Sequence, residues 1–212
     1  MKVSADEIHK RFPAFEKELV RDIVEVAETK LLKKGEHMMR QGQYIKSVWL
    51  ILDGLVKVCR ENGNGGNYFM HYLEPGHSCA LSMMCGTQQR VSEITATAFT
   101  KTTILAIPLS CMDKWMVEYK SWYQFVFDTF RMRVKELLDT IDSVVFRNMD
   151  DRIIFYLQRH QDVLQTRDIP LTRTEIAKEL NSSREVVTRV LKKLSHKGKL
   201  KMHRQYIEIL NL

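Results

Sequence analysis

Hydrophobic and polar residues alternate along the chain with two different periodicities, one typical of strands and one typical of helices. From Thr29 to about Leu109, short β-branched, aromatic and aliphatic runs are separated by polar or Gly-rich turns such as "KKGE", "RQGQ", "LDG" and "ENGNGG". Many short strands with regular turns are typical of a β-barrel or sandwich. Before this region, Leu19, Ile23 and Val26 follow at spacings of four and three, which predicts a helix ahead of the strands.

After the predicted barrel, the apolar residues follow the periodicity of a helix instead of that of strands. The run from Asp113 to Val145 contains no Gly or Pro, and its apolar residues follow at alternating spacings of four and three. These residues are Tyr123, Phe127, Phe130, Val134, Leu137, Ile141 and Val144. A stripe facing the protein's own core is one interpretation. A seam held for three heptads without a helix breaker favours pairing with a second copy, so we expect a parallel, two-fold symmetric homodimer.

The last third of the chain carries the start and stop signals of a short helix. It opens with the amphipathic run "DDRIIFYLQRHQ", which predicts one helix of its own. Thr172 and Glu175 then have the S/T-x-x-E spacing of a capping box, so a further helix should begin at Arg173. It should stop near Asn181, because Asn tolerates the left-handed conformation that a tight turn needs.

A second short helix should follow that turn directly. Ser182 or Ser183 is suited to be its N-cap, and Gly198 marks its end just after His196. Beyond Gly198, "LKM" and "YIEIL" alternate in polarity around "HRQ", which predicts a β-hairpin. Two short helices around a tight turn followed by a hairpin make up a winged helix-turn-helix.

Net charge separates this last third from the rest of the chain. Residues 151–212 hold 13 Lys and Arg against 7 Asp and Glu, whereas residues 1–150 hold 20 against 19. The whole chain has a formal charge of +7. The excess predicts a polyanionic partner for the C-terminal part, which would be nucleic acid or an anionic membrane. We favour nucleic acid, because the apolar face of the second helix is needed for its own domain's core.

The second helix of the pair has one apolar and one charged face. A solvated face would explain the charge alone, but Arg and Glu together in the first turn suit the edges of bases: Arg donates to guanine and Glu accepts from cytosine. We expect base contacts from Arg184, Glu185 and Arg189. We expect contacts with the DNA backbone from Thr172, Arg173, Ser183, Thr188, Lys192, Lys193, His203 and Arg204.

These stretches resemble a known family. "LTRTEIAKELNSSREVVTRVLKKL" resembles the winged helix-turn-helix of the bacterial Crp/Fnr transcription regulators, with "SREVVTR" as its most specific part. "KKGEHMMRQG", "VWLILDGLVKV" and "YLEPG" resemble their cyclic-nucleotide-binding-type barrel. The resemblance covers nearly the whole chain. It departs from the family pattern at Asn181, where members usually have Gly.

The resemblance implies an α+β fold in three parts. These are an N-terminal antiparallel β-barrel or jelly roll at residues 1–112, a dimerisation helix at 113–147 and a winged helix-turn-helix at 148–212. It also implies sequence-specific binding of double-stranded DNA as a homodimer. The implied target is a palindrome with a TGTGA-like or TTGA-like half-site, with RNA polymerase as a further partner.

The resemblance also locates an effector pocket, and the residues there do not suit cyclic AMP. Ala80 and Leu81 occupy the positions of a Gly-Glu pair that holds the ribose, and Arg90 and Val91 those of an Arg-Ser pair that holds the phosphate. The helix positions that face the base are Leu137 and Leu138. The absence of several buried hydrogen bonds, worth about 1–3 kcal/mol each, should abolish useful affinity. We therefore expect no response to cyclic AMP and leave effector and cofactor unknown.

The sequence is compatible with two other functions. His77, Cys79 and Cys85, with His71 nearby, would suit a haem- or redox-sensing regulator, although buried reduced thiols are the simpler interpretation. A cupin-type metal enzyme is a more remote alternative, since the histidines never form H-x-H. We predict neither catalytic nor metal-binding residues. The N-terminus lacks the apolar core of a signal peptide, and we expect a cytoplasmic protein.

Overall fold

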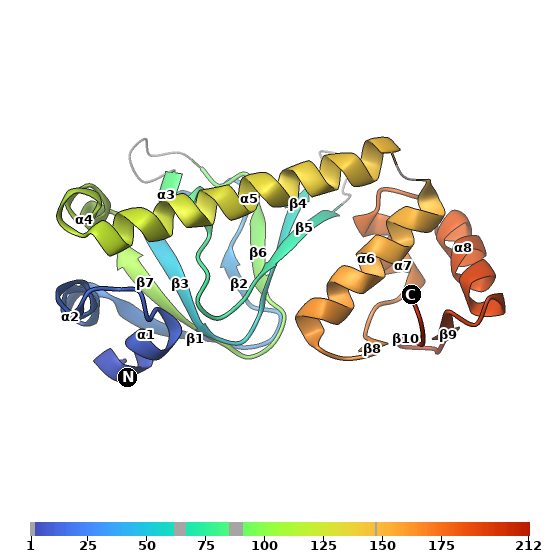
Figure 1. The fold of residues 1–212 in the computed structure, drawn as a ribbon, viewed down its shortest axis with the longest axis horizontal. Coiled ribbons are helices and arrows are strands. Elements are labelled where there is room, and N and C mark those ends of the chain that lie inside the picture. Colours follow the sequence, from blue (N-terminus) through green and yellow to red (C-terminus); the bar gives the residue numbers. More distant parts are fainter. Residues whose placement is uncertain (1–2, 62–66, 85–90, 147) are drawn as a thin grey trace. The chain divides into compact units, whose positions relative to one another are not determined.

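The structure is a computed structural model that describes residues 3–61, 67–84, 91–146 and 148–212. These fall into two compact units. The first consists of Met1–Arg60 and Met70–Lys135, and the second of Glu61–Phe69 and Glu136–Leu212. The fold is α+β, as the sequence predicts, with the strand-rich region and the helix-turn-helix in separate parts of the chain (Figure 1).

Two antiparallel sheets account for the predicted strands. One has the order β1 (Glu28–Leu32), β7 (Thr102–Pro108) and β3 (Ser47–Asp53). The other has the order β2 (His37–Met39), β6 (Thr95–Ala98), β4 (Val56–Glu61) and β5 (Asn67–Leu73). Side chains from both sheets gather in one apolar cluster. The expected barrel is therefore open: its strands form two separate sheets that share a core.

Strand β3 is apolar from Val48 to Leu52 because both of its faces pack against apolar clusters. Val48 and Leu50 contribute to a cluster formed with helices, whereas Ile51 contributes to the cluster shared by the two sheets. Strand β7 behaves likewise, with Leu105 in the first cluster and Ile104 in the second. Alternate side chains of a strand point to opposite faces, so a strand covered on both sides needs a continuous hydrophobic run.

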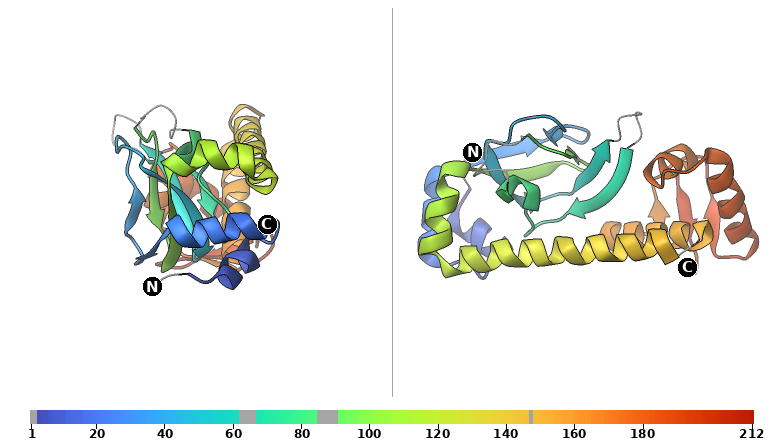
Figure 2. Two further views of the ribbon diagram at one scale, coloured as in Figure 1. Left: turned by 90° about the vertical axis from the view of Figure 1, so that its left-hand side faces the viewer. Right: turned by 90° about the horizontal axis from the view of Figure 1, so that it is seen from above.

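Helices α1 (Ala5–Arg11), α2 (Lys17–Val26) and α4 (Met112–Glu118) lie at one end of the first unit (Figures 1 and 2). With the start of α5 (Lys120–Phe146) they bury an aromatic cluster. Its ring pairs include Phe12 and Phe15, with centroids 5.0 Å apart. A 3₁₀ turn (Leu109–Cys111) precedes α4, and the short helix α3 (Ala80–Met84) follows β5.

The prediction of one unbroken helix from Asp113 is wrong at one point. Helix α4 ends at Glu118 and Tyr119 takes an extended conformation, with φ −117° and ψ 109°. Residues seven apart on a straight helix rise by about 10.5 Å, yet the rings of Trp115 and Trp122 have centroids 5.3 Å apart. Both tryptophans are fully buried. The break thus lets both indoles enter one core. The spacing of apolar residues in the sequence does not predict this break.

The second unit contains the predicted winged helix-turn-helix. Its helices are α6 (Met149–Leu164), α7 (Arg173–Glu179) and α8 (Arg184–His196). Its sheet has the order β8 (Asp168–Ile169), β10 (Ile207–Ile209) and β9 (Leu200–Met202), so β9 and β10 form the hairpin expected after Gly198. Figure 2 shows this hairpin next to the end of α8. Within the described part of the chain, no helix is long and apolar enough to span a membrane.

Candidate DNA interface

The start of α7 follows from a complete capping box. The Thr172 hydroxyl accepts a hydrogen bond from the Glu175 backbone N–H (3.2 Å), and a Glu175 carboxylate oxygen accepts one from the Thr172 N–H (2.7 Å). Two otherwise unpaired donors at the helix start are thereby satisfied. The predicted start at Arg173 is confirmed.

The turn between the helices has the geometry that the sequence predicts. Asn181 lies at φ +49°, in the left-handed region, and the Ser182 N–H reaches back to the Ala177 carbonyl (2.9 Å). The Ser183 hydroxyl then accepts from the Val186 N–H (3.2 Å) and caps α8. This cap fixes the first residue of α8 as Arg184, so two of the predicted base-contacting residues lie in its first turn.

Glu185 is held as a negatively charged acceptor in that turn. Hydrogen bonds from its own backbone N–H and from the side chain of Ser183 lower the pKa of the Glu185 carboxyl below its usual value. The side chain is exposed. A carboxylate at a helix N-terminus also interacts favourably with the helix dipole. Glu185 can therefore accept hydrogen bonds, for example from an amino group of a base.

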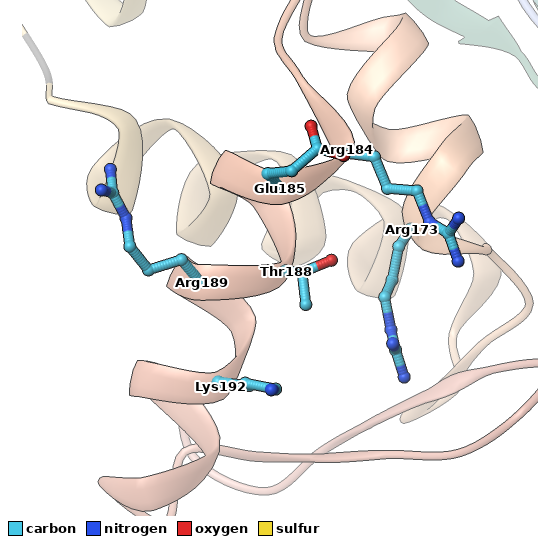
Figure 3. A pocket seen from close by; sticks show the side chains of 6 residues that line it. All are labelled: Arg173, Arg184, Glu185, Thr188, Arg189 and Lys192. Atoms are coloured by element: carbon cyan, nitrogen blue, oxygen red, sulfur yellow. The ribbon is translucent and has the colours of Figure 1, made fainter.

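The two sides of α8 differ completely in character. Val187, Val190, Leu191 and Leu194 are buried, whereas the opposite side carries five polar residues that we call the α8 recognition face: Arg184, Glu185, Thr188, Arg189 and Lys192. Together with Arg173 of α7, these five residues line an open hollow of about 580 Å³. In Figure 3, Arg173, Arg184 and Lys192 extend on one side of α8 and Arg189 on the other.

Helix α6 holds the end of α7 through polar contacts that the sequence pattern does not reveal. The Tyr156 hydroxyl donates to a carboxylate oxygen of the buried Glu179 (2.6 Å). Leu180 is the C-cap residue of α7, and its carbonyl accepts a hydrogen bond from the Arg152 guanidinium (2.9 Å). These contacts join residues 23 and 28 positions apart. They set where the turn lies, and hence where the recognition face lies in this unit.

The structure gives several predicted backbone-contacting residues another partner. Lys193 forms an ion pair with Asp150 in the first turn of α6. In the hairpin, His203 lies 3.1 Å from a carboxylate oxygen of Glu208 and stacks on Tyr206. Thr172 and Ser183 act as helix caps, as described above, and Arg204 is exposed between the hairpin strands.

The described positions that the resemblance assigns to an effector are apolar and differ in exposure. Ala80 is buried, and Leu81 packs against the cluster shared by the two sheets. Val91 is 41% exposed, and Leu137 and Leu138 are about half exposed. Arg90 lies outside the described residues. No described side chain among these positions offers a hydrogen-bond donor or acceptor.

The candidate haem or redox residues lie in different surroundings. Cys79 is buried in the cluster shared by the sheets, and burial raises the pKa of its thiol. His77 is only partly buried, and its Nδ1 accepts from the Glu74 backbone N–H (3.4 Å). His71 is buried, and Cys85 lies outside the described residues. Among the side chains that are described, no three His, Cys, Asp or Glu form a group that could hold a metal ion.

Comparison with known proteins agrees with this geometry. Residues 29–119 match the model of the cyclic nucleotide-binding domain, and residues 151–212 match that of the Crp-like helix-turn-helix domain. The chain is 22% identical to the global nitrogen regulator of Synechococcus elongatus over 186 residues, 84% of either protein. It is 24% identical to the transcriptional activator protein FnrA of Stutzerimonas stutzeri over 190 residues, 85% of this chain and 75% of FnrA.

A solved structure shares the fold over almost its whole length. It is described as a transcriptional regulator of the Crp/Fnr family from Eubacterium rectale, with a TM-score of 0.80 and 22% identity, covering 92% of this chain and 91% of that one. The chain is therefore a transcriptional regulator with a cyclic nucleotide-binding-type domain and a helix-turn-helix, not an enzyme. It belongs to the Crp/Fnr family.

Proposed function

We propose that this regulator binds a palindromic DNA site as a homodimer, with one α8 recognition face in each half-site. The observation that best supports this proposal is the composition of the α8 recognition face. It carries two arginines and an ionised glutamate, all exposed, on a helix whose other side is buried. Arg184, Glu185 and Arg189 then contact base edges in the major groove. Arg173, Thr188 and Lys192 contact phosphates, which supply affinity without sequence information.

The surface of α5 supports pairing with a second copy. Five of the seven predicted seam residues are 45–55% exposed, which is unusual for large apolar side chains in such a regular row: Tyr123, Phe127, Val134, Leu137 and Ile141. Phe130 packs against the first unit's own core, and the side chain of Val144 lies outside those described. Burying such a row against its symmetry mate removes its apolar area from water.

The same dimer explains a palindromic target. Two-fold symmetry places two identical recognition faces in successive major grooves, which are about 34 Å apart along the duplex. The half-sites would resemble TGTGA or TTGA, as the family resemblance of "SREVVTR" implies. RNA polymerase is the partner on which such a regulator would act.

We further propose that the effector is not cyclic AMP. Leu81 and Val91 replace the polar residues that the family uses for the ribose and the phosphate, and Leu137 and Leu138 those that face the base. A buried ligand atom that finds no hydrogen-bond partner weakens binding by about 1–3 kcal/mol. Calorimetric titration with cyclic AMP should show no binding, and micromolar affinity would contradict this part of the proposal.

Selection of bound sequences from random DNA tests the proposed function as a whole. We expect the full chain to enrich a palindrome whose half-site centres are one helical turn apart. A variant with Arg184→Ala and Arg189→Ala should still bind DNA weakly but should enrich no motif. Enrichment of a non-palindromic site, or of the same motif by that variant, would contradict the proposal.

A further inference from the structure

A hollow of about 600 Å³ in the first unit is lined by residues that all lie outside the winged helix-turn-helix. It lies between the turn that follows β5, at Gly76 and His77, and one side of α5. None of its lining residues is among the positions that the family resemblance assigns to an effector. Its volume falls within the range of about 300–1,000 Å³ that is usual for small-molecule sites.

Two side chains of α5 make the floor of this hollow apolar. Phe125 and Met132 both line it, and they are seven residues apart and thus on the same side of the helix. The Phe125 ring is fixed by edge-on contacts with the rings of Phe12 and Phe15, with ring centroids 5.6 Å and 5.1 Å apart. The floor extends over about 10 Å along the helix axis. This length suits one aromatic ring or a short alkyl chain.

His77 contributes a hydrogen-bond donor beside this floor. Its Nδ1 accepts from the Glu74 N–H, so the ring proton of the neutral form belongs on Nε2. Burial and, to a lesser extent, the nearby charge of Arg133 lower the pKa of His77, although the charge of Glu74 opposes them, and this favours the neutral imidazole. A neutral imidazole with its proton on Nε2 can donate to an oxygen atom of a ligand.

The charged residues that line the hollow are Asp128, Arg131 and Lys135, which together carry one net positive charge. Arg131 is 3.2 Å from a carboxylate oxygen of Asp128, so these two largely neutralise each other. Lys135 also lines the hollow, and it makes no ion pair with any residue that the structure describes. One net cation matches one carboxylate. A phosphate monoester would bring a second negative charge, which Asp128 would repel.

We propose that this hollow binds a small organic monocarboxylate, with its apolar body on Phe125 and Met132 and its carboxylate at Lys135 and His77. This inference does not depend on DNA binding. It gives the protein a site for a small molecule on the same helix that carries the exposed seam, at residues that the family's nucleotide pocket does not use.

Phenylacetate is a suitable probe, because its ring shifts nearby methyl resonances. We would record the methionine methyl spectrum of the full chain, which has 11 methionines, and assign Met132 by its loss in Met132→Leu. Titration should move the Met132 signal saturably, with a dissociation constant in the millimolar range. Lys135→Gln should weaken binding by up to about five-fold, the upper end of the range for one exposed charge pair. Lys120→Gln, at the exposed start of α5, is the matched control and should bind as the wild type does.

Benzyl alcohol and inorganic phosphate separate the two halves of the proposed ligand. Benzyl alcohol keeps the ring without the charge and should bind about five-fold more weakly than phenylacetate, whereas phosphate keeps a charge without the ring and should leave Met132 unmoved. The other methionine signals report whether each variant is folded. No saturable Met132 shift up to about 20 mM phenylacetate would overturn the proposal. Equal binding of phenylacetate by wild type and Lys135→Gln would overturn it too.

Discussion

The ion pair between Asp150 and Lys193 should limit how tightly this regulator holds DNA. Asp150 lies in the first turn of α6, where the helix dipole stabilises a carboxylate, and it takes up the ammonium of a lysine on α8. Lys193 follows the recognition face directly after Lys192. While its charge is paired, it cannot neutralise a phosphate. Asp150→Asn removes the competing charge at little change in shape, so Lys193 becomes available to the duplex.

The expected gain can be worked out from counterion release. Each additional phosphate contact steepens the slope of log affinity against log salt by about 0.9. At 0.1 M salt this corresponds to binding that is up to about eight-fold tighter, or about 1.2 kcal/mol. The folded state should lose no more than about 1 kcal/mol, because the Lys193 side chain in the pair is 55% exposed and such pairs contribute little to stability.

The assay is fluorescence anisotropy on a labelled random duplex over a series of salt concentrations. Asp150→Asn should steepen the slope by about one contact relative to wild type. Lys193→Ala should leave the wild-type slope nearly unchanged, and the double variant should lose the gain. If the double variant kept the gain, Lys193 would not be its source. An unchanged slope for Asp150→Asn would refute the assignment itself.

Three further predictions concern stability and assembly. Tyr156→Phe removes the hydroxyl that donates to the buried Glu179, so the free energy of unfolding should fall by about 1–3 kcal/mol in denaturant titrations. Phe127→Glu should shift the proposed dimer towards monomer in light scattering, without lowering the monomer's melting temperature, because this side chain is 55% exposed. The hydrogen bond from Tyr119 to Asp22 (2.9 Å) raises the pKa of the phenol from 10.0 to about 12. The folded state then keeps a proton that the unfolded chain loses, so stability should fall between pH 10 and 12, and Tyr119→Phe should lessen that fall.

The features that the sequence predicted correctly depend on neighbouring residues. The capping box of Thr172 and Glu175, the left-handed Asn181 and the cap at Ser183 each involve residues only a few positions apart. Local chemistry of this kind decides where a helix starts or stops, whatever the rest of the fold does. The helix-turn-helix could therefore be located to the residue.

The features that it missed depend on residues far apart in the chain. The break at Tyr119 follows from burial of Trp115 and Trp122 in one core, and the spacing of apolar residues along the helix does not indicate this break. The ion pair of Lys193 with Asp150 joins positions 43 residues apart, so a lysine expected at a phosphate has a carboxylate beside it. The order of the strands within each sheet is a similar case, because strand lengths and turns do not determine which strands pair.

The most direct test of the central claim compares Arg189→Ala with Lys192→Ala on two duplexes, the selected palindrome and a random sequence. Arg189→Ala should weaken binding to the palindrome by about 1–3 kcal/mol, relax specificity at one base pair and leave random binding almost unchanged. Lys192→Ala should weaken both equally and reduce the salt slope by about 1. Equal losses on both duplexes for Arg189→Ala would contradict the claim that the α8 recognition face contacts bases.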